Sequence, residues 1–431
     1  MKNIFKIAFL LLMFGLSNKV NAQEHTITLD SSKKAALNYS YIIKNSHLNY
    51  QSSELDKLST EANRLPTVDG TGFIMYGFKD FVKAVPPLLN KGINNFYFAG
   101  ASATEPIYMG GKIKTGIELS QLQMEVNKIK EKQAADSVVL LTEQKYWRLV
   151  QLQEQYKVLL ANEVWVDGVM KQMKDMLASG LIARNDLLKV KVRKSELELS
   201  KSKLKNGHKL AIFDFSLYTG IPYDSLLVAI DTLGTLQKPD QLFVSPEEAL
   251  TSNNDMHLLE QNSKAKKLQT KLTKADYMPT VAAGVNVRQF GVIGNGQFNN
   301  FMPIAFGTVS VPISGLWWGS GKHKMKQQKI NEEIAQNNLI DGQRQIKTGI
   351  LQNWYDMVDA YQQISYANDN LEEATENLKV SRDNFSSGLM GITDLLDAQA
   401  SYQQASSSII DSYAGYRSKI ASYKHIVGKN E

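Results

Sequence analysis

The sequence predicts a mainly α-helical protein with a smaller β portion, built from a duplicated unit of helix, β-hairpin, long helix and helix. The first observation is a repeated phrase: residues 179–188 read SGLIARNDLL and residues 387–396 read SGLMGITDLL, so the offset is 208 residues. The second is a pair of long proline-free helical stretches, and the third is a period-two apolar pattern before each of them. Such a constant offset indicates two copies of one structural unit.

The N-terminus has the pattern of a signal peptide over residues 1–22. Lys2 and Lys6 precede a short apolar stretch that ends at Leu16, and Val20-Asn21-Ala22 forms a small-residue cleavage site. We therefore expect an exported mature chain that starts at Gln23. The sequence contains no cysteine, so we expect neither a lipid anchor on cysteine, nor disulfides, nor thiolate metal sites.

The net charge and the hydropathy of the sequence argue against a nucleic-acid partner and against transmembrane helices. The formal net charge is +6, and removal of the three lysines of the signal peptide leaves +3 for the mature chain. Such a small excess does not favour a nucleic-acid partner. No later stretch reaches the roughly 18 uninterrupted apolar residues of a transmembrane helix. Any membrane-embedded portion is therefore predicted to consist of β-strands.

Each repeat is predicted to begin with a helix. Repeat 1 covers residues 23–232 and repeat 2 covers residues 233–431. In repeat 2 the phrase Ser245-Pro246-Glu247-Glu248 places a capping serine, a proline at the first helical position and two acids at a helix start. We expect this helix to run to about Asp276, and its counterpart in repeat 1 to run from about Asp30 to Asn63.

Both first helices lead into predicted strands through the phrases Leu65-Pro66-Thr67-Val68 and Met278-Pro279-Thr280-Val281. From Val281 onward apolar and polar residues alternate, which is typical of a strand with two different faces. We expect strands at about 66–78 and 97–107 in repeat 1, and at about 279–290 and 304–314 in repeat 2. The intervening segments, 80–95 and 291–300, are predicted to be loops.

A long helix follows each hairpin. No proline occurs from Lys112 to Ala178 or from Lys322 to Ser387, and apolar residues recur there with the 3, 4, 3 spacing of a coiled coil. Each helix would be about 100 Å long at ~1.5 Å per residue. Gly180 and Gly388 break the two helices, after which a second helix returns in each repeat.

The sequence shows no catalytic motif. The six histidines are scattered, and we expect no enzymatic activity, no cofactor and no metal site. Gly315 to Lys322 only faintly resembles a phosphate-binding loop, because its glycine spacing is too long and His323 replaces the required Ser or Thr. The basic stretch from Lys189 to Lys209 is interpreted as a solvated helix face instead of a nucleic-acid or lipid-headgroup patch.

Two further features have two interpretations each. Trp317 and Trp318, at a predicted strand end, suit an aromatic belt at a bilayer interface or a core pair in a soluble protein. Asp394 and Asp397 lie three residues apart at a helix start, and therefore on one helix face. They either complement the helix dipole or act together as a functional pair.

These motifs together resemble the TolC-type outer-membrane factor family, the outer membrane efflux proteins that serve Gram-negative bacteria as exit ducts for efflux and secretion. The resemblance covers nearly the whole mature chain. It depends on the Ser245 helix start, the strand entries, Pro312 with Gly319-Ser320-Gly321, and above all on the segment from Phe385 to Ala398.

The resemblance implies a homotrimer in the outer membrane that extends into the periplasm. Three protomers share a twelve-stranded β-barrel and a long α-barrel, which meets a periplasmic adaptor and an inner-membrane pump. Membrane physics is consistent with this assembly, because a lipid-embedded sheet must close and four strands per chain are too few. Outer-membrane lipid is therefore an expected partner, and nucleic acid is not.

The resemblance also implies roles for individual residues. The channel constriction is assigned to Asp394, Asp397, Phe385 and Asp186. The membrane-interface belt of Trp317 and Trp318 is favoured separately, by their place at a predicted strand end. The adaptor-docking tips are Gly180, Leu181, Ile182, Gly388, Leu389 and Met390. Two positions depart from the family pattern: Phe385 replaces a tyrosine and lacks its hydroxyl, and Met390 replaces an arginine.

We therefore expect a passive outer-membrane channel for small molecules in a tripartite efflux system. The alternative within the family is the channel of a type I protein secretion system. The alternative of another class is an exported coiled-coil scaffold without a pore, against which the alternating strands argue.

Overall fold

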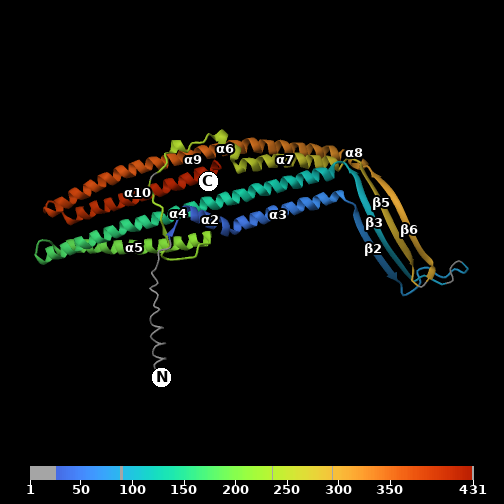
Figure 1. The fold of residues 1–431 in the computed structure, drawn as a ribbon, viewed down its shortest axis with the longest axis horizontal. Helices are drawn as coiled ribbons and strands as arrows, with labels where there is room; N and C mark the ends of the chain where they lie inside the picture. Colours follow the sequence, from blue (N-terminus) through green and yellow to red (C-terminus); the bar gives the residue numbers. More distant parts are fainter. Residues whose placement is uncertain (1–25, 88–90, 235, 294, 430–431) are drawn as a thin grey trace, which may run out of the picture. The chain divides into compact units, whose positions relative to one another are not determined.

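The computed structural model describes residues 26–87, 91–234, 236–293 and 295–429. Its elements follow the same succession twice, with one short additional helix, α8, in the second copy (Figure 1). The predicted signal peptide, residues 1–22, lies outside the described residues. Repeat 1 contains α2 (Leu29–Tyr39), α3 (Tyr41–Glu61), β2 (Thr67–Tyr76), β3 (Asn95–Met109), α4 (Lys112–Ala178) and α5 (Arg184–Thr219). Repeat 2 contains α6 (Pro246–Ser252), α7 (Asn254–Ala275), β5 (Thr280–Val292), β6 (Asn295–Ser310), α8 (Ile313–Trp317), α9 (Ser320–Ser386) and α10 (Ile392–Ile426).

Each first helix, predicted as continuous, is in fact two helices. The breaks fall at Ser40 between α2 and α3, and at Asn253 between α6 and α7. Asn253 has an extended backbone, and its side chain accepts a hydrogen bond from the Met256 backbone N–H at 3.0 Å. The amide thus caps a new helix start, a local preference that outweighs continuation of the first helix.

The four long strands form one antiparallel sheet in the order β2-β3-β5-β6 (Figure 1). The central β3–β5 pair comes from different repeats, so the two hairpins share one sheet. β2 and β6 each leave one edge without a partner among the described strands. A separate short parallel pair joins β1 (Thr26–Ile27) to β4 (Val228–Ala229) in the connection between the repeats.

Repeat 2 departs from its predicted strand bounds. β6 begins at Asn295 and not near residue 304, so most of the predicted loop 291–300 belongs to strands. Val292 pairs directly with Asn295, and this ladder outweighs the turn preference of the local glycines and asparagines. At the other end, Ile313 was expected in the strand but begins the short helix α8.

The strand register sorts the sheet into two faces, because directly paired residues point to the same side. One side, here called the apolar face, carries Val68, Ile74, Ala99, Ala101, Ala103, Val285, Val287, Phe301, Pro303, Ala305 and Val309. The other side, here called the polar face, carries Thr67, Asp69, Thr71, Ser102, Thr104, Asn286, Arg288, Thr308 and Ser310. Several large apolar-face side chains are exposed in the single chain, Val285 to 54% and Val309 to 71%.

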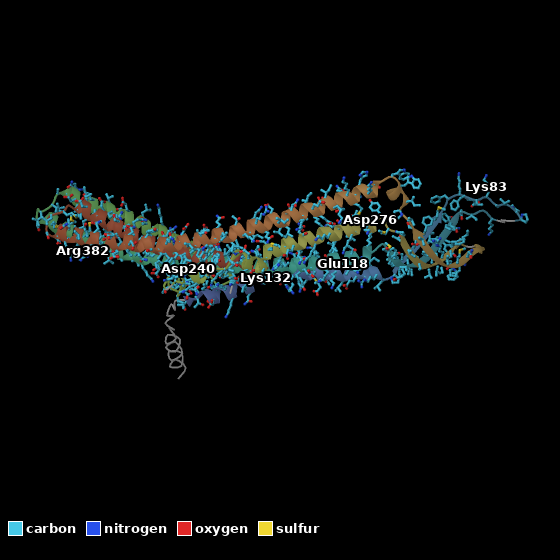
Figure 2. All side chains as sticks on the ribbon, turned by 90° about the horizontal axis from the view of Figure 1, so that it is seen from above. Lys83, Glu118, Lys132, Asp240, Asp276 and Arg382 are labelled. Atoms are coloured by element: carbon cyan, nitrogen blue, oxygen red, sulfur yellow. The ribbon has the colours of Figure 1, made fainter. Side chains whose placement is uncertain are left out.

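The chain packs into two compact units, each of which takes segments from both repeats. The tip unit comprises residues 1–40, 136–244 and 351–431, and the sheet unit comprises residues 41–135 and 245–350. In the sheet unit, ion pairs join neighbouring helices: Lys112 Nζ lies 2.8 Å from Asp276 Oδ1, and Lys271 Nζ lies 3.8 Å from Glu118 Oε2 (Figure 2 labels both acids).

Within the described ranges, none of the helices combines the length and the apolar character that crossing a membrane requires.

Candidate functional site

The two helix turns at Gly180 and Gly388 have the same backbone structure. Both glycines have a φ of 73°, in the left-handed region that favours glycine. The Gly180 N–H bonds the Leu177 carbonyl and the next N–H bonds Met176; around Gly388 the corresponding acceptors are Phe385 and Asn384. This pair of bonds defines the Schellman motif, which ends a helix at a glycine. The repeated phrase therefore encodes a repeated turn.

A buried apolar cluster in the tip unit supports both turns. It includes Met173 on α4, Val190 on α5 and Leu395 on α10, each nearly inaccessible to solvent. Ile182 and Phe385 pack against this cluster and are only partly exposed.

Of the four apolar residues assigned to the docking tips, Leu181 and Leu389 are exposed, whereas Ile182 and Met390 are partly buried. The exposed apolar surface of each turn is therefore centred on a single leucine. Gly180 and Gly388 themselves have open space around them.

The acidic residues assigned to the constriction have two different environments. Asp186, in the first turn of α5, forms an ion pair with Lys189 at 3.2 Å. Asp394 and Asp397, in the first turns of α10, are both exposed, and no ion pair joins either of them to another described residue. Among the acids assigned to the constriction, those without an ion pair are therefore the two on α10.

Lys189 is a residue that the sequence reasoning missed at this site. Its Nζ also donates to Thr393 Oγ1 at 2.9 Å, so one side chain on α5 contacts the start of α10. This contact between the two turns involves neither Phe385 nor Met390. The repeat could have identified Lys189 from the sequence. Lys189 lies 208 residues before Asp397 and is therefore its counterpart in repeat 1.

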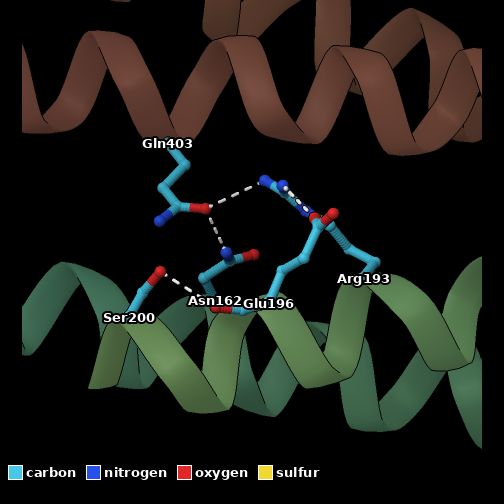
Figure 3. Close-up of polar contacts among 5 residues, drawn as sticks. All are labelled: Asn162, Arg193, Glu196, Ser200 and Gln403. Atoms are coloured by element: carbon cyan, nitrogen blue, oxygen red, sulfur yellow. Dashed lines mark hydrogen bonds and ion pairs between the residues drawn. The ribbon is translucent and has the colours of Figure 1, made fainter. Parts of the chain in front are cut away.

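A second missed feature is a buried amide cluster between α4, α5 and α10 (Figure 3). Asn162 Nδ2 and Arg193 Nη2 both donate to Gln403 Oε1, the latter at 3.3 Å. Gln399 Nε2 donates to Asn162 Oδ1 at 3.0 Å, and both residues are almost fully buried. Because buried amides are costly unless they are hydrogen-bonded, this cluster specifies how these three helices pack.

The basic stretch of α5 is partly neutralised by α4. Lys194 pairs with Asp167 and Lys201 with Glu163, each at 2.5 Å. The interpretation as a solvated helix face therefore needs a refinement, because part of the stretch forms ion pairs with the neighbouring helix.

The tryptophan pair does not end a strand, contrary to expectation. Trp317 is the last residue of α8, Trp318 caps it, and their side chains are 80% and 78% exposed. The nearby glycines have a packing role: a Cβ at Gly315 or at Gly321 would lie 2.8 Å from the Tyr277 ring. Among the described residues, no cluster of His, Asp or Glu side chains is arranged to hold a metal ion.

Comparison with known proteins finds a family match in the second repeat. Residues 245–419 match the family model described as outer membrane efflux protein. This segment is therefore similar to outer membrane efflux proteins. The resemblance predicted from the sequence is thereby confirmed, and the family is one of efflux and transport at the outer membrane. No curated protein sequence matches the chain.

Solved outer-membrane channels share the fold over nearly their whole length. The Campylobacter jejuni CmeC outer membrane channel has a TM-score of 0.79 at 14% identity, covering 93% of this chain and 86% of that one. The open-state Neisseria gonorrhoeae MtrE outer membrane channel has a TM-score of 0.75 at 14% identity, covering 93% and 89%. The Vibrio cholerae outer membrane protein VceC has a TM-score of 0.75 at 13% identity, covering 93% and 96%.

Proposed function

We propose that the protein is the outer-membrane exit channel of a tripartite efflux system, which passively conducts small molecules from the periplasm to the exterior. Three copies assemble into one duct, and the helix tips dock a periplasmic adaptor joined to an inner-membrane pump. The protein carries out no chemical reaction and needs no cofactor. The family match of the second repeat supports the general activity, and the geometry of this chain supports the details.

The sheet is the observation that carries the proposal. Its apolar face has no covering element among the described residues, and exposed apolar surface of this extent marks an interaction with lipid or protein. Its edge strands, β2 and β6, have free backbone hydrogen-bonding groups, which lipid does not satisfy. Pairing of β2 with β6 of a neighbouring copy satisfies these edges, and three copies of four strands give a closed barrel of twelve whose apolar face is covered by lipid.

In that barrel the apolar face meets lipid and the polar face lines the pore. Trp317 and Trp318, exposed beyond the end of β6, suit the interfacial belt that aromatic residues form on such barrels. A soluble coiled-coil scaffold provides no reason for an extended sheet with one uncovered apolar face. The type I secretion alternative uses the same duct and differs in the cargo that the pump delivers.

Two neighbouring substitutions on β5 test the assignment of the faces. Val285→Arg puts a charge on the lipid-facing side and is expected to prevent membrane insertion, at a cost of about 2–4 kcal/mol near the bilayer centre. Asn286→Arg adds the same charge on the pore-facing side and is expected to insert. Each protein is reconstituted into planar bilayers for conductance measurements, and its mass in detergent is determined.

The wild-type protein should have the mass of three protomers and produce discrete conductance steps. The channel proposal is contradicted if the Val285→Arg and Asn286→Arg proteins insert into bilayers equally well. It is also contradicted if the wild-type protein is a monomer that needs no detergent and does not conduct. Isolation of the native complex from membranes then identifies the pump and distinguishes small-molecule efflux from protein secretion.

A further inference from the structure

The sheet carries an apolar pocket near the ends of its two hairpins, about 510 Å³ in volume. Its lining includes Met75, Phe81, Val82, Phe96, Phe290 and Asn300. Ligand pockets in proteins typically measure about 300–1,000 Å³ and are mainly apolar and aromatic, with a few polar groups. This pocket fits that description, because none of the described side chains that line it is ionisable.

The pocket lies on the polar face of the sheet. The register places Met75 opposite Phe96, and Phe98 opposite both Phe73 and Phe290, so these side chains share the face of Asn286 and Arg288. The phenylalanine and methionine side chains of the pocket therefore lie on the face that carries threonine, serine and asparagine on β2, β3 and β5, and on which β6 contributes Ile304 and Phe306.

The segment after β2 completes the pocket from above this face. Gly77 N–H bonds the Asn94 carbonyl, and Val82 forms an antiparallel bridge with Ile93. Phe81 lies against Gly77, where a Cβ would meet its ring. Phe81 and Val82 remain 47% exposed, which leaves the apolar walls accessible from solution.

We infer that this pocket binds an uncharged aromatic small molecule, one per chain. Three phenylalanine rings and a methionine sulfur offer stacking and sulfur–aromatic contacts. The absence of charged groups among the described lining residues disfavours ionic ligands, whose desolvation would go uncompensated. Within the proposed function the occupant is aromatic cargo close to its exit, and that assignment rests on the proposed function, whereas binding itself does not.

Photolabelling with benzophenone, a neutral aromatic ketone, tests the pocket. The full-length mature protein in lipid nanodiscs is irradiated with benzophenone, and adducts are located by mass spectrometry. Pocket adducts are expected on Met75 and Phe96. Ile74 and Phe301 on the apolar face provide an internal reference for probe dissolved in the lipid.

Phe81→Ser removes one wall of the pocket, and Phe78→Ser is the matched control. Phe78 belongs to the same segment, is 98% exposed and does not line the pocket. Loss of the Phe81 ring should lower the ratio of pocket adducts to reference adducts about tenfold, as expected when a phenyl contact is removed. The Phe78 variant should keep the wild-type ratio. Val82→Ser should act in the same direction as Phe81→Ser and provides a second variant if that protein fails to fold.

Three results would overturn the inference. One is equal loss of labelling in the Phe78 and Phe81 variants, and another is labelling of Ile74 without Met75 or Phe96. The third is pocket labelling in a detergent monomer that disappears in the trimer, since a neighbouring copy then fills the site. Conductance of the same samples separates the two proposals: a conducting protein without pocket adducts refutes only the pocket, whereas a labelled protein that does not conduct refutes only the channel.

Discussion

The two helix tips have the same backbone turn but opposite arrangements of charge. Each has a glycine at φ 73°, the same two Schellman bonds and an aspartate six residues after the glycine. Three residues further on, the first tip has Lys189 and the second has Asp397. One i, i+3 pair is therefore an ion pair within α5, and the other is a pair of like charges on α10.

This difference shows that the two copies share the residues that the backbone turn requires but not the charges on the exposed helix face. The turn requires glycine because other residues are strained in the left-handed region, so both copies retain it. The charges on the exposed helix face do not determine the fold, so they are free to differ between the copies. A ring of three such chains would expose six carboxylates from α10, whereas the α5 aspartates are compensated by Lys189.

The largest expected effect comes from removal of the like-charge pair. Asp394→Asn together with Asp397→Asn should reduce the cation preference of the channel by roughly tenfold, the lower end of the local enrichment that a charged cleft produces. Reversal potentials in asymmetric salt measure the preference. Asp186→Asn is the matched control and should have a smaller effect, because Lys189 already compensates that charge. If the double variant keeps its selectivity, the aspartates only complement the helix dipole.

Conversion of the first tip to the charge pattern of the second is expected to have the next largest effect. Lys189→Asp removes the contacts with Asp186 and Thr393 and adds one carboxylate per chain. Cation preference should rise, and the contact between the two turns should be lost. Lys191→Asp, on an exposed residue of the same helix, controls for net charge. Equal shifts in the two variants would show that Lys189 has no special place at the tip.

The shared backbone predicts matched losses of stability. Gly180→Ala and Gly388→Ala should each destabilise the protein by about 1–2 kcal/mol, the cost of a left-handed alanine. Both sites are open, so strain and not a clash is the cause. Gly168→Ala, inside α4, should instead stabilise by about 0.5–1 kcal/mol. Melting of the three variants provides the test, and clearly unequal losses at the two turns would argue against their equivalence.

The smallest expected effect concerns another matched pair, His208 on α5 and Tyr416 on α10, again 208 residues apart. The Tyr416 hydroxyl donates to the Gln237 carbonyl at 2.6 Å, and burial raises the pKa of Tyr416 to about 12. His208 Nε2 is buried without a partner among the described residues, and burial lowers the pKa of His208.

As the pH falls below about 6.5, the ordinary pKa of histidine, the unfolded chain takes up a proton that the folded chain resists. Stability should therefore decline with acidification until the pH passes the lowered pKa of the folded state. His208→Gln should flatten this part of the melting profile, and His257→Gln, at a partly exposed site, should not. Parallel profiles for wild type and His208→Gln would exclude a contribution from His208.

Aromatic pairs at equivalent positions of the two repeats keep their ring contact, but the tyrosine hydroxyl lies on a different helix in each repeat. Tyr146 contacts Phe215 at 6.3 Å between ring centroids, and the residues 208 positions later, Trp354 and Tyr423, contact each other at 5.6 Å. The hydroxyl is on α4 in one copy and on α10 in the other. Tyr146 binds the Ile27 carbonyl, and Tyr423 binds the backbone of Val244. Local sequence patterns do not reveal such an exchange.

The features that depend on near neighbours along the chain could be predicted from the sequence. The repeat offset, the glycine turns, the long helices and the strand alternation follow from backbone preferences and from the periods of helix and strand. These suffice for the succession of elements, although the breaks at Ser40 and Asn253 and the early start of β6 depend on capping and pairing that local propensity does not capture.

Contacts between residues far apart in the chain could not be predicted from the sequence and become visible in the folded protein. It pairs β3 with β5 across the repeats, brings Lys189 to Thr393, and buries Asn162 against Gln399 and Gln403. It also assigns segments of both repeats to each compact unit. The physical reason is that these contacts join residues far apart in the chain, and only the fold brings their hydrogen-bonding groups and charges within range of one another.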